Sequence, residues 1–220
     1  MLVRDRMTRE VITINSHTPI LEAQKIMKDK KIRRLPVVDN QKLVGIVTYN
    51  DLLEATPSKV TTLSRFELTY LLSKMTVAEI MKKMVITVSP DTPLEEVALI
   101  MKQNEIGGVP VVEDSKVVGI ITESDIFEAL VETLGVEEGG SRITLELPQK
   151  PGILHEVTGI VKKHDVNILS LATFYDEEHP QFRYVVMRVA VRDPGPLVEE
   201  LSQHPEIVVK HVWVSPEEEV

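Results

Sequence analysis

The first fifty residues pass between apolar runs and polar turns in an order that predicts strand, helix, strand, strand, helix. The β-branched run Val11–Ile14 predicts the first strand. Thr18 as N-cap and Pro19 after it are typical of a helix start. The apolar residues that follow recur every three or four positions, as one buried helix face requires, and these are Ile20, Ala23, Ile26 and Met27.

Two further apolar runs flank a polar turn. Leu35–Val38 and Leu43–Val47 lie on either side of residues 39–42, a pattern that predicts a β-hairpin. A short helix is expected to begin at Thr48. It should end at or just before Pro57, because proline lacks the amide hydrogen that a helix interior needs.

The same plan is repeated without gaps later in the chain. Gly45–Asp51 reads Gly-Ile-Val-Thr-Tyr-Asn-Asp and Gly119–Asp125 reads Gly-Ile-Ile-Thr-Glu-Ser-Asp, an offset of 125 − 51 = 74 residues. We therefore predict a first repeat in residues 1–56 and a second repeat in residues 77–136. A repeat of about 50 residues buries a small core, so the two are expected to pack face to face, with ligand sites in the clefts between them.

The rest of the chain predicts a different fold. Residues 57–76 are expected to form a connecting helix, residues 137–141 a flexible linker, and residues 216–220 an acidic tail. Residues 142–215 alternate in the order βαββαβ, which predicts a ferredoxin-like layer of four antiparallel strands with two helices on one face. The predicted fold class of the whole chain is therefore α+β.

Composition narrows the range of functions. The formal net charge of −9 argues against nucleic-acid binding, which needs clustered Lys and Arg, and the lack of cysteine excludes disulfides and thiolate sites. No apolar run approaches the roughly 20 residues that a membrane helix needs, and the first residues lack the apolar core of a signal peptide. The sequence therefore predicts a cytoplasmic protein without membrane contact.

Catalytic motifs are missing from the sequence. It has no phosphate-binding P-loop and no Gly-x-Ser-x-Gly elbow, and its histidines do not follow a metal-ligand spacing. We therefore expect no enzyme activity, no catalytic cofactor and no metal site. The six histidines are His17, His155, His164, His179, His204 and His211.

The repeated Thr-x-x-Asp motif has two physical interpretations. Thr48 with Asp51, and Thr122 with Asp125, can cap the helix that follows by accepting hydrogen bonds from its free amides. Alternatively, the aspartates can accept hydrogen bonds from a ribose diol, while the helix start favours a phosphate. From the spacing alone, capping is the simpler explanation.

Further motifs make the chain resemble known families. The Thr-Pro helix starts, the Pro-Val-Val strands and the two Gly-x-x-Thr-x-x-Asp endings resemble a tandem CBS-domain pair, also called a Bateman module. Residues 142–215 resemble an ACT domain through Pro151–Leu154 and Val166–Ile168. The domain order is similar to the acetoin-utilisation B family. The CBS resemblance implies that Thr48, Asp51, Thr122 and Asp125 contact the phosphate and ribose of an adenine nucleotide.

The two repeats differ at one informative place. Arg33 and Arg34 stand where the second repeat has Gly107 and Gly108, so the site near Asp51 is expected to hold a phosphate better than the other. The CBS resemblance gives these arginines a role in phosphate contact, although a solvated basic patch would explain them equally well. An adenine ring needs an apolar slot, for which Ile12 and Ile86 are candidates, although both could simply be core residues.

The ACT resemblance offers a second ligand site. Gly152 would let the backbone approach a ligand, and Asn167 could hold an amino acid by hydrogen bonds. Gln149 replaces an acidic residue that amino-acid-binding relatives often carry two places before Pro-Gly, which favours a purely structural, dimerising ACT domain. Such domains commonly pair, so the resemblance implies a homodimer.

The resulting hypothesis is a regulatory sensor. An adenine nucleotide (AMP, ADP, ATP or S-adenosylmethionine) would bind in the CBS clefts, and the ACT domain would couple it to a client enzyme, in acetoin metabolism if the family resemblance holds. The alternative is a structural or interaction subunit of a metabolic enzyme that binds no small ligand.

Overall fold

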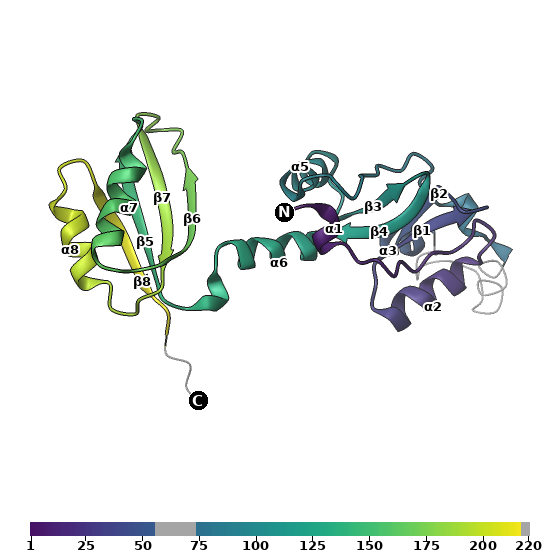
Figure 1. Cartoon of the computed structure of the whole chain (residues 1–220). Coiled ribbons are helices and arrows are strands. Elements are labelled where there is room, and N and C mark those ends of the chain that lie inside the picture. The colour runs from purple at the N-terminus through teal and green to yellow at the C-terminus, as the bar shows by residue number, and fades with distance from the viewer. Residues whose placement is uncertain (56–73, 217–220) are drawn as a thin grey trace. The chain divides into compact units, whose positions relative to one another are not determined.

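A computed structural model of the chain describes residues 1–55 and 74–216. The chain divides into two compact units, Met1–Ile126 and Phe127–Val220 (Figure 1). The helix expected over residues 57–76 lies almost entirely outside the described residues. Among the residues that are described, none of the helices has the length and apolar character needed to cross a membrane.

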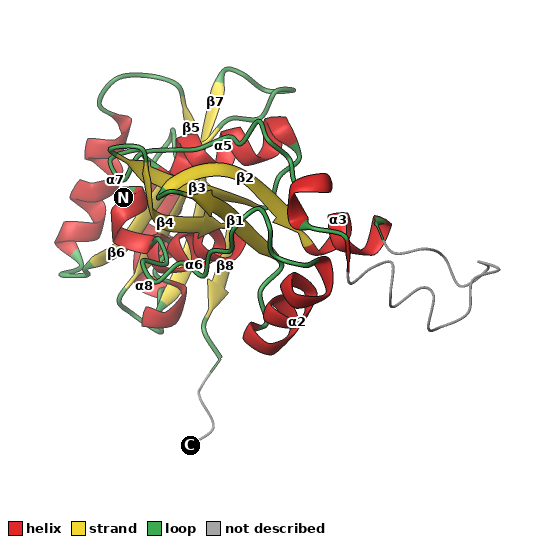
Figure 2. Cartoon of the chain, turned by 90° about the vertical axis from the view of Figure 1, so that its right-hand side faces the viewer, coloured by secondary structure: helices red, strands yellow, loops and turns green. Residues whose placement is uncertain are grey.

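Each repeat in the first unit contains an 11-residue helix, a β-hairpin and a further helix. The hairpins are antiparallel and carry the same irregularity, between Val37 and Val38 in one and between Val111 and Val112 in the other. They lie side by side, with β2 next to β4 (Figure 2). The elements are α1 (Val3–Arg6), α2 (Ile20–Lys30), β1 (Arg34–Asp39), β2 (Lys42–Thr48), α3 (Tyr49–Glu54), η1 (Val77–Glu79), α5 (Leu94–Asn104), β3 (Gly108–Glu113), β4 (Lys116–Thr122) and α6 (Glu123–Thr133).

The strand expected at Val11–Ile14 is wrong as a full strand. Ile14 alone pairs with β1, where its N–H bonds to Pro36 O at 3.1 Å and its carbonyl accepts from Val38 N at 2.8 Å. Earlier in the same segment, Thr8 pairs with Ile120 of the second repeat. The segment crosses from one hairpin to the other, so it cannot follow either hairpin for long.

The expected N-cap at Thr18 is also wrong. Pro19 is the N-cap of α2, and no side chain caps that helix start. Instead the N–H of Ile20 donates to Met75 O at 3.1 Å, and the carbonyl of Thr18 accepts from Val77 N at 2.9 Å. The beginning of the second repeat thus satisfies the helix start of the first.

The two repeats exchange their first segments. In the converse contact, Val3 N donates to Thr92 O at 2.9 Å in the second repeat, and Val3 is fully buried. Met7 lies over Gly119, while Met81 lies over Gly45, where a Cβ would come within 2.5 Å of its sulfur. Each repeat is therefore packed against a segment of the other. Glycine occurs at positions 45 and 119 because a methionine of the crossing segment fills the space that a Cβ would need.

The second unit is the predicted βαββαβ layer. Its antiparallel sheet has the order β6-β7-β5-β8, and α7 and α8 cover one face (Figure 1). The core lies between helices and sheet and includes Leu145, Val157, Met187 and Leu201. The elements are β5 (Ser141–Pro148), α7 (Ile153–Lys163), β6 (Ile168–Phe174), β7 (Phe182–Val189), α8 (Gly195–Gln203) and β8 (Val208–Val214).

The linker expected at residues 137–141 is partly structured. It overlaps a short 3-10 turn, η2 (Val136–Glu138), and ends inside β5. Arg188, only 4% exposed, donates from Nη1 to Gly139 O at 2.9 Å and from Nε to Leu134 O at 3.2 Å. These carbonyls satisfy the buried guanidinium and hold the segment against the sheet.

Candidate functional site

The Thr-x-x-Asp motif of the first repeat forms a capping box at the start of α3. Thr48 donates to Asp51 Oδ2 from both its N–H and its hydroxyl, each at 2.7 Å, and the Asp51 N–H donates back to Thr48 Oγ1 at 3.3 Å. Capping therefore occupies one carboxylate oxygen. The other, Oδ1, lies 4.0 Å from Lys82 Nζ, so the aspartate can accept a second hydrogen bond while it caps the helix.

The second repeat has nearly the same local geometry. Thr122 donates to Asp125 Oδ2 from its N–H and from its hydroxyl, again at 2.7 Å each. Because two copies of one motif cap helices in the same way, any difference in ligand binding between them must come from their surroundings.

A cavity of about 530 Å³ opens beside the first motif. Its volume is within the range of small-molecule sites, roughly 300–1,000 Å³. The structure gathers five of the eight residues that the sequence proposes for nucleotide binding, namely Thr48, Asp51, Arg33, Arg34 and Ile86. The other three, Ile12, Thr122 and Asp125, do not line this cavity. Ile12 packs against the core of the first repeat, as the alternative interpretation expected.

The cavity walls come from both repeats. Apolar residues line part of it, and these are Ile46, Met84, Val85, Ile86, Ile106 and Pro110. Charged side chains of both signs line the rest: Arg33, Arg34 and Lys82 are basic, whereas Asp51, Glu54 and Glu105 are acidic. An apolar slot beside balanced charges suits a flat ring carrying a polar, modestly charged group.

Arg34 extends from the first repeat onto the second. Its Nη1 donates a hydrogen bond to the carbonyl of Gly107, and the guanidinium lies over Gly108. Burial, and then the charge of Arg33, lowers the pKa of Arg34, while the carboxylates of Glu123 and Asp125 act in the opposite direction. Arginine stays charged, so Arg34 supplies positive charge to the side of the cavity that contains Gly107 and Gly108.

Lys82 and Met84 line the cavity but were not predicted as site residues from the sequence. They lie on the segment after η1 that crosses to the first repeat, where Lys82 pairs with Ile46. The 74-residue offset could have suggested this, because Met7–Thr8 and Met81–Lys82 are matching positions. No local pattern, however, indicates that either segment leaves its own repeat.

The two residues proposed for an ACT ligand do not meet. Gly152 is the N-cap of α7 with φ of +88°, and Asn167 follows the other end of that 11-residue helix. Asn167 lines a cavity of about 410 Å³ with Thr158, Asp165 and Val166, but Gly152 does not. One ACT unit therefore does not combine them in a single site.

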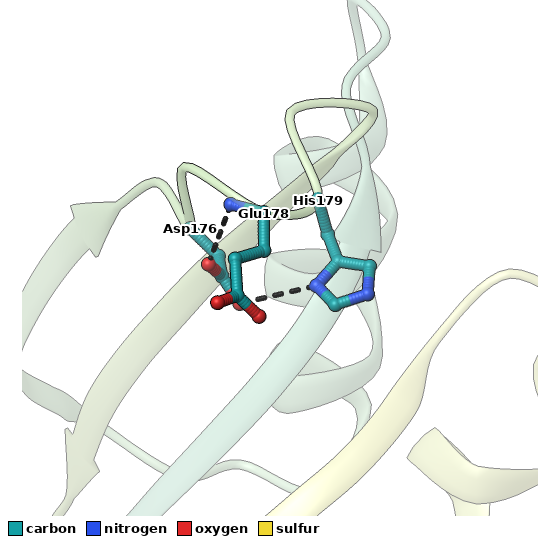
Figure 3. A group of neighbouring side chains, drawn as sticks. All are labelled: Asp176, Glu178 and His179. Carbon is teal, nitrogen blue, oxygen red and sulfur yellow. Dashed lines mark hydrogen bonds and ion pairs between the residues drawn. The ribbon is translucent and has the colours of Figure 1, made fainter.

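A group of possible metal ligands lies in the turn between β6 and β7. Asp176, Glu178 and His179 place their ligand atoms within 4.8 Å of one another (Figure 3). Asp176 accepts the N–H of Glu178 at 3.0 Å and faces His179 Nδ1 at 3.2 Å, which lowers the pKa of the Asp176 carboxyl. The turn itself accounts for these contacts, so the proximity gives no argument for a metal ion.

Comparison with protein families agrees with the two units. The CBS domain matches residues 3–58 and 77–132. The TTHA0829-like ACT domain matches residues 139–210.

Curated proteins and solved structures include several that are similar to the first part of this chain. L-aspartate semialdehyde sulfurtransferase of Methanocaldococcus jannaschii is 40% identical over 127 residues, which are 57% of this chain and 22% of that enzyme. This chain thus spans less than a quarter of that relative.

Among solved structures, the CBS domain pair of protein MJ0100, in complex with 5-methylthioadenosine and S-adenosyl-L-methionine, is 39% identical with a TM-score of 0.50. The match covers 59% of this chain and 99% of that one. A Vibrio cholerae protein assigned to acetoin utilization (AcuB) is 34% identical with a TM-score of 0.52, covering 63% of this chain and 96% of that one.

Proposed function

The chain belongs to the CBS-domain family and carries two CBS domains followed by an ACT domain, and from this premise we propose that it is a regulatory protein that binds an adenine nucleotide in the cavity beside Asp51. The observation that carries the proposal is that this cavity gathers five of the proposed nucleotide-binding residues, described above.

Each part of an adenine nucleotide has a complementary group in the cavity. The apolar wall formed by Ile86, Pro110 and Ile46 suits the adenine ring. Asp51 keeps Oδ1 available for the ribose diol while Oδ2 serves the helix cap. Arg33, Arg34 and Lys82 supply donors for phosphate.

The charge balance favours a ligand with few negative charges. The three basic side chains of the cavity are matched by the three acidic ones, Asp51, Glu54 and Glu105. A nucleoside monophosphate, or an adenosine derivative such as S-adenosylmethionine, should fit better than a triphosphate, whose extra charge has no partner. The adenosine ligands of the MJ0100 pair support the same class.

The regulatory role extends the proposal beyond binding. Ligand occupancy would be relayed through the ACT domain of a homodimer to a client enzyme, and the likeness to AcuB supports acetoin metabolism as the setting. An amino acid bound at the ACT domain would add a second signal. The chain itself would not catalyse a reaction.

Thermal denaturation with AMP, ADP, ATP, S-adenosylmethionine and methylthioadenosine tests the binding. A ligand at 100 times its dissociation constant adds about 2.7 kcal/mol to the free energy of unfolding, so the melting temperature of the first unit should rise. AMP or S-adenosylmethionine should raise it more than ATP does.

Asp51→Ala and Asp125→Ala form a matched pair for this experiment. Both remove a helix cap, but only Asp51 lines the cavity. Each variant is compared with its own ligand-free melting temperature, and only Asp51→Ala should lose the ligand-induced rise. If no adenosine ligand raises the melting temperature of the wild type, or Asp51→Ala responds normally, the proposal is wrong.

A ligand-free interaction subunit is the second candidate. The large exposed apolar side chains of the first unit favour it, among them Met84, which is 96% exposed, and Leu53, which is 47% exposed. Copurification of a stoichiometric enzyme with protein that binds none of the adenosine ligands would support this candidate.

A further inference from the structure

The side chain of Arg34 lies against two consecutive glycines of the second repeat, Gly107 and Gly108. Gly107 offers its carbonyl to the guanidinium, and Gly108 lies directly beneath it. The same carbonyl accepts the N–H of Glu123, the first residue of α6, at 3.1 Å. The arginine of one repeat is therefore held by backbone of the other.

Side chains at the two glycine positions would not leave room for this arrangement. A Cβ at position 108 would overlap Arg34 Nη1 and come within 3.0 Å of its Cδ. A Cβ at position 107 would lie 2.6 Å from Glu123 Oε2 and 2.9 Å from Arg34 Nη2. Real Cβ atoms do not approach other atoms so closely, so the guanidinium occupies the space that a side chain would need.

The duplication relates the arginine to the glycine that it contacts. Position 108 corresponds to position 34, since 34 + 74 = 108. Any residue other than glycine at position 108 would displace Arg34 from its place. The glycines of the second repeat thus leave the space that the Arg34 guanidinium of the first repeat fills.

We propose that Gly107 and Gly108 form a seat that fixes Arg34 as the phosphate-binding cation of the cavity beside Asp51. The phosphate site is then built by both repeats together. A guanidinium has five N–H donors, and one is directed to Gly107 O, so donors remain for phosphate oxygens. Fixing a long side chain before the ligand arrives reduces the ordering cost of binding.

This inference rests on the proposed adenine-nucleotide function and assigns a role to residues that need not touch the ligand. Gly107 and Gly108 are positioning residues, and their effect should appear only for ligands that carry a phosphate. Adenosine and AMP are therefore the two probes. They share the base and the ribose, and they differ by the phosphate group.

The experiment measures the dissociation constants of AMP and adenosine by calorimetry for the full chain and for Arg34→Ala, Gly108→Ala and the double variant. Arg34→Ala should weaken AMP binding about tenfold or more, the effect expected for losing a charge-assisted contact. Adenosine binding should change less than about twofold. Gly108→Ala should reproduce this pattern because its methyl group expels the guanidinium.

The double variant shows whether Gly108→Ala weakens AMP binding by displacing Arg34 or in some other way. Once Arg34 is shortened to alanine, the methyl group at position 108 meets no guanidinium, so Gly108→Ala should add no further loss of AMP affinity. Gly159→Ala, a glycine of α7 whose Cβ would meet nothing within 4 Å, is the matched control and should change neither dissociation constant.

The outcomes separate this inference from the function on which it rests. If the wild type binds neither AMP nor adenosine, the proposed function fails and the seat fails with it. If the wild type binds AMP but Gly108→Ala keeps the normal ratio of AMP to adenosine affinity, only the seat is wrong. If Gly108→Ala loses both ligands, recovery of adenosine binding in the double variant supports the seat, and a lack of recovery overturns it.

Discussion

A single carboxylate can serve both of the roles considered for the Thr-x-x-Asp motif. In the first repeat, Asp51 Oδ2 accepts two hydrogen bonds from Thr48, while Oδ1 remains toward Lys82 and the cavity. Capping and ligand binding are therefore compatible in one residue. The cap holds the carboxylate in a fixed orientation, which is what a ribose-binding acceptor needs.

Replacing Thr48 by valine should destabilise the first unit. Valine keeps the size and branching of threonine but removes the hydroxyl that accepts from the Asp51 N–H and donates to its carboxylate. The loss of an N-cap typically costs about 1 kcal/mol. Urea denaturation should show this loss for Thr48→Val, while Thr48→Ser, which keeps the hydroxyl, should stay within about 0.5 kcal/mol of the wild type. Equal stability of all three proteins would contradict the capping role.

Helix starts and hairpins of each CBS repeat are bonded to or packed against segments that lie far away in the sequence. The start of α2 is satisfied by residues near η1, and β2 and β4 each lie under a methionine from the other repeat. Local patterns predicted that these helices and hairpins exist. Their boundaries and close contacts depend on the crossing segments.

Gly45→Ala should destabilise the contact between β2 and the segment after η1. The new methyl group would meet Met81 Sδ at 2.5 Å and the carbonyl of Lys82 at 3.2 Å. Overpacking of this kind costs about 1–3 kcal/mol. The change in free energy of unfolding is measured by urea denaturation. Met81→Ala should relieve part of the penalty in the double variant, and strictly additive effects would show that the methyl group does not meet Met81.

The sheet of the ACT unit should lose stability in acid through Glu146. Tyr184 donates to Glu146 Oε2 at 2.7 Å and Lys210 donates to the same oxygen at 3.1 Å, which lowers the pKa of the Glu146 carboxyl below its usual value of about 4.5. A lowered pKa in the folded state stabilises the fold above pH 4.5. That contribution is lost as the pH falls through the lowered pKa.

Glu146→Gln provides the comparison for this pH dependence. The wild type should be more stable than the variant at pH 7, and the difference should shrink at pH values below about 4.5. Trp213 on β8 is the single tryptophan of the chain, so its fluorescence follows the unfolding of this unit. A difference that stays constant from pH 7 to pH 3 would show that the carboxylate charge does not stabilise the sheet.

In the whole molecule, the exchange of first segments joins the two CBS repeats into one unit. Val3 and Val77 are both fully buried, and each donates its N–H to the helix start of the other repeat. A structural change in one repeat should therefore alter the other repeat as well. This connection gives a physical route by which ligand binding in one cleft could alter both repeats.

Val3→Ala should destabilise the second repeat more than the first. The substitution removes buried methyl groups and is expected to cost roughly 2 kcal/mol. Hydrogen exchange should become faster in α5, next to the Val3 contact at Thr92, and should change less in α2. Glu10→Ala, at an exposed position later in the same segment, is the control, and a stronger effect on α2 than on α5 would contradict the exchanged arrangement.

The sequence was sufficient for the duplication, the hairpins, the βαββαβ order and the two Thr-x-x-Asp caps, because each follows from periodicity, turn chemistry or spacing within a few residues. The sequence also identified Asp51 and Arg34 as candidate ligand-binding residues. The extent of the strand at Val11–Ile14, the true start of α2, the contribution of Lys82 to the cavity and the position of Arg34 over Gly108 came only from the tertiary structure. These features depend on segments crossing between repeats, and contacts over about seventy residues leave no local pattern in the chain.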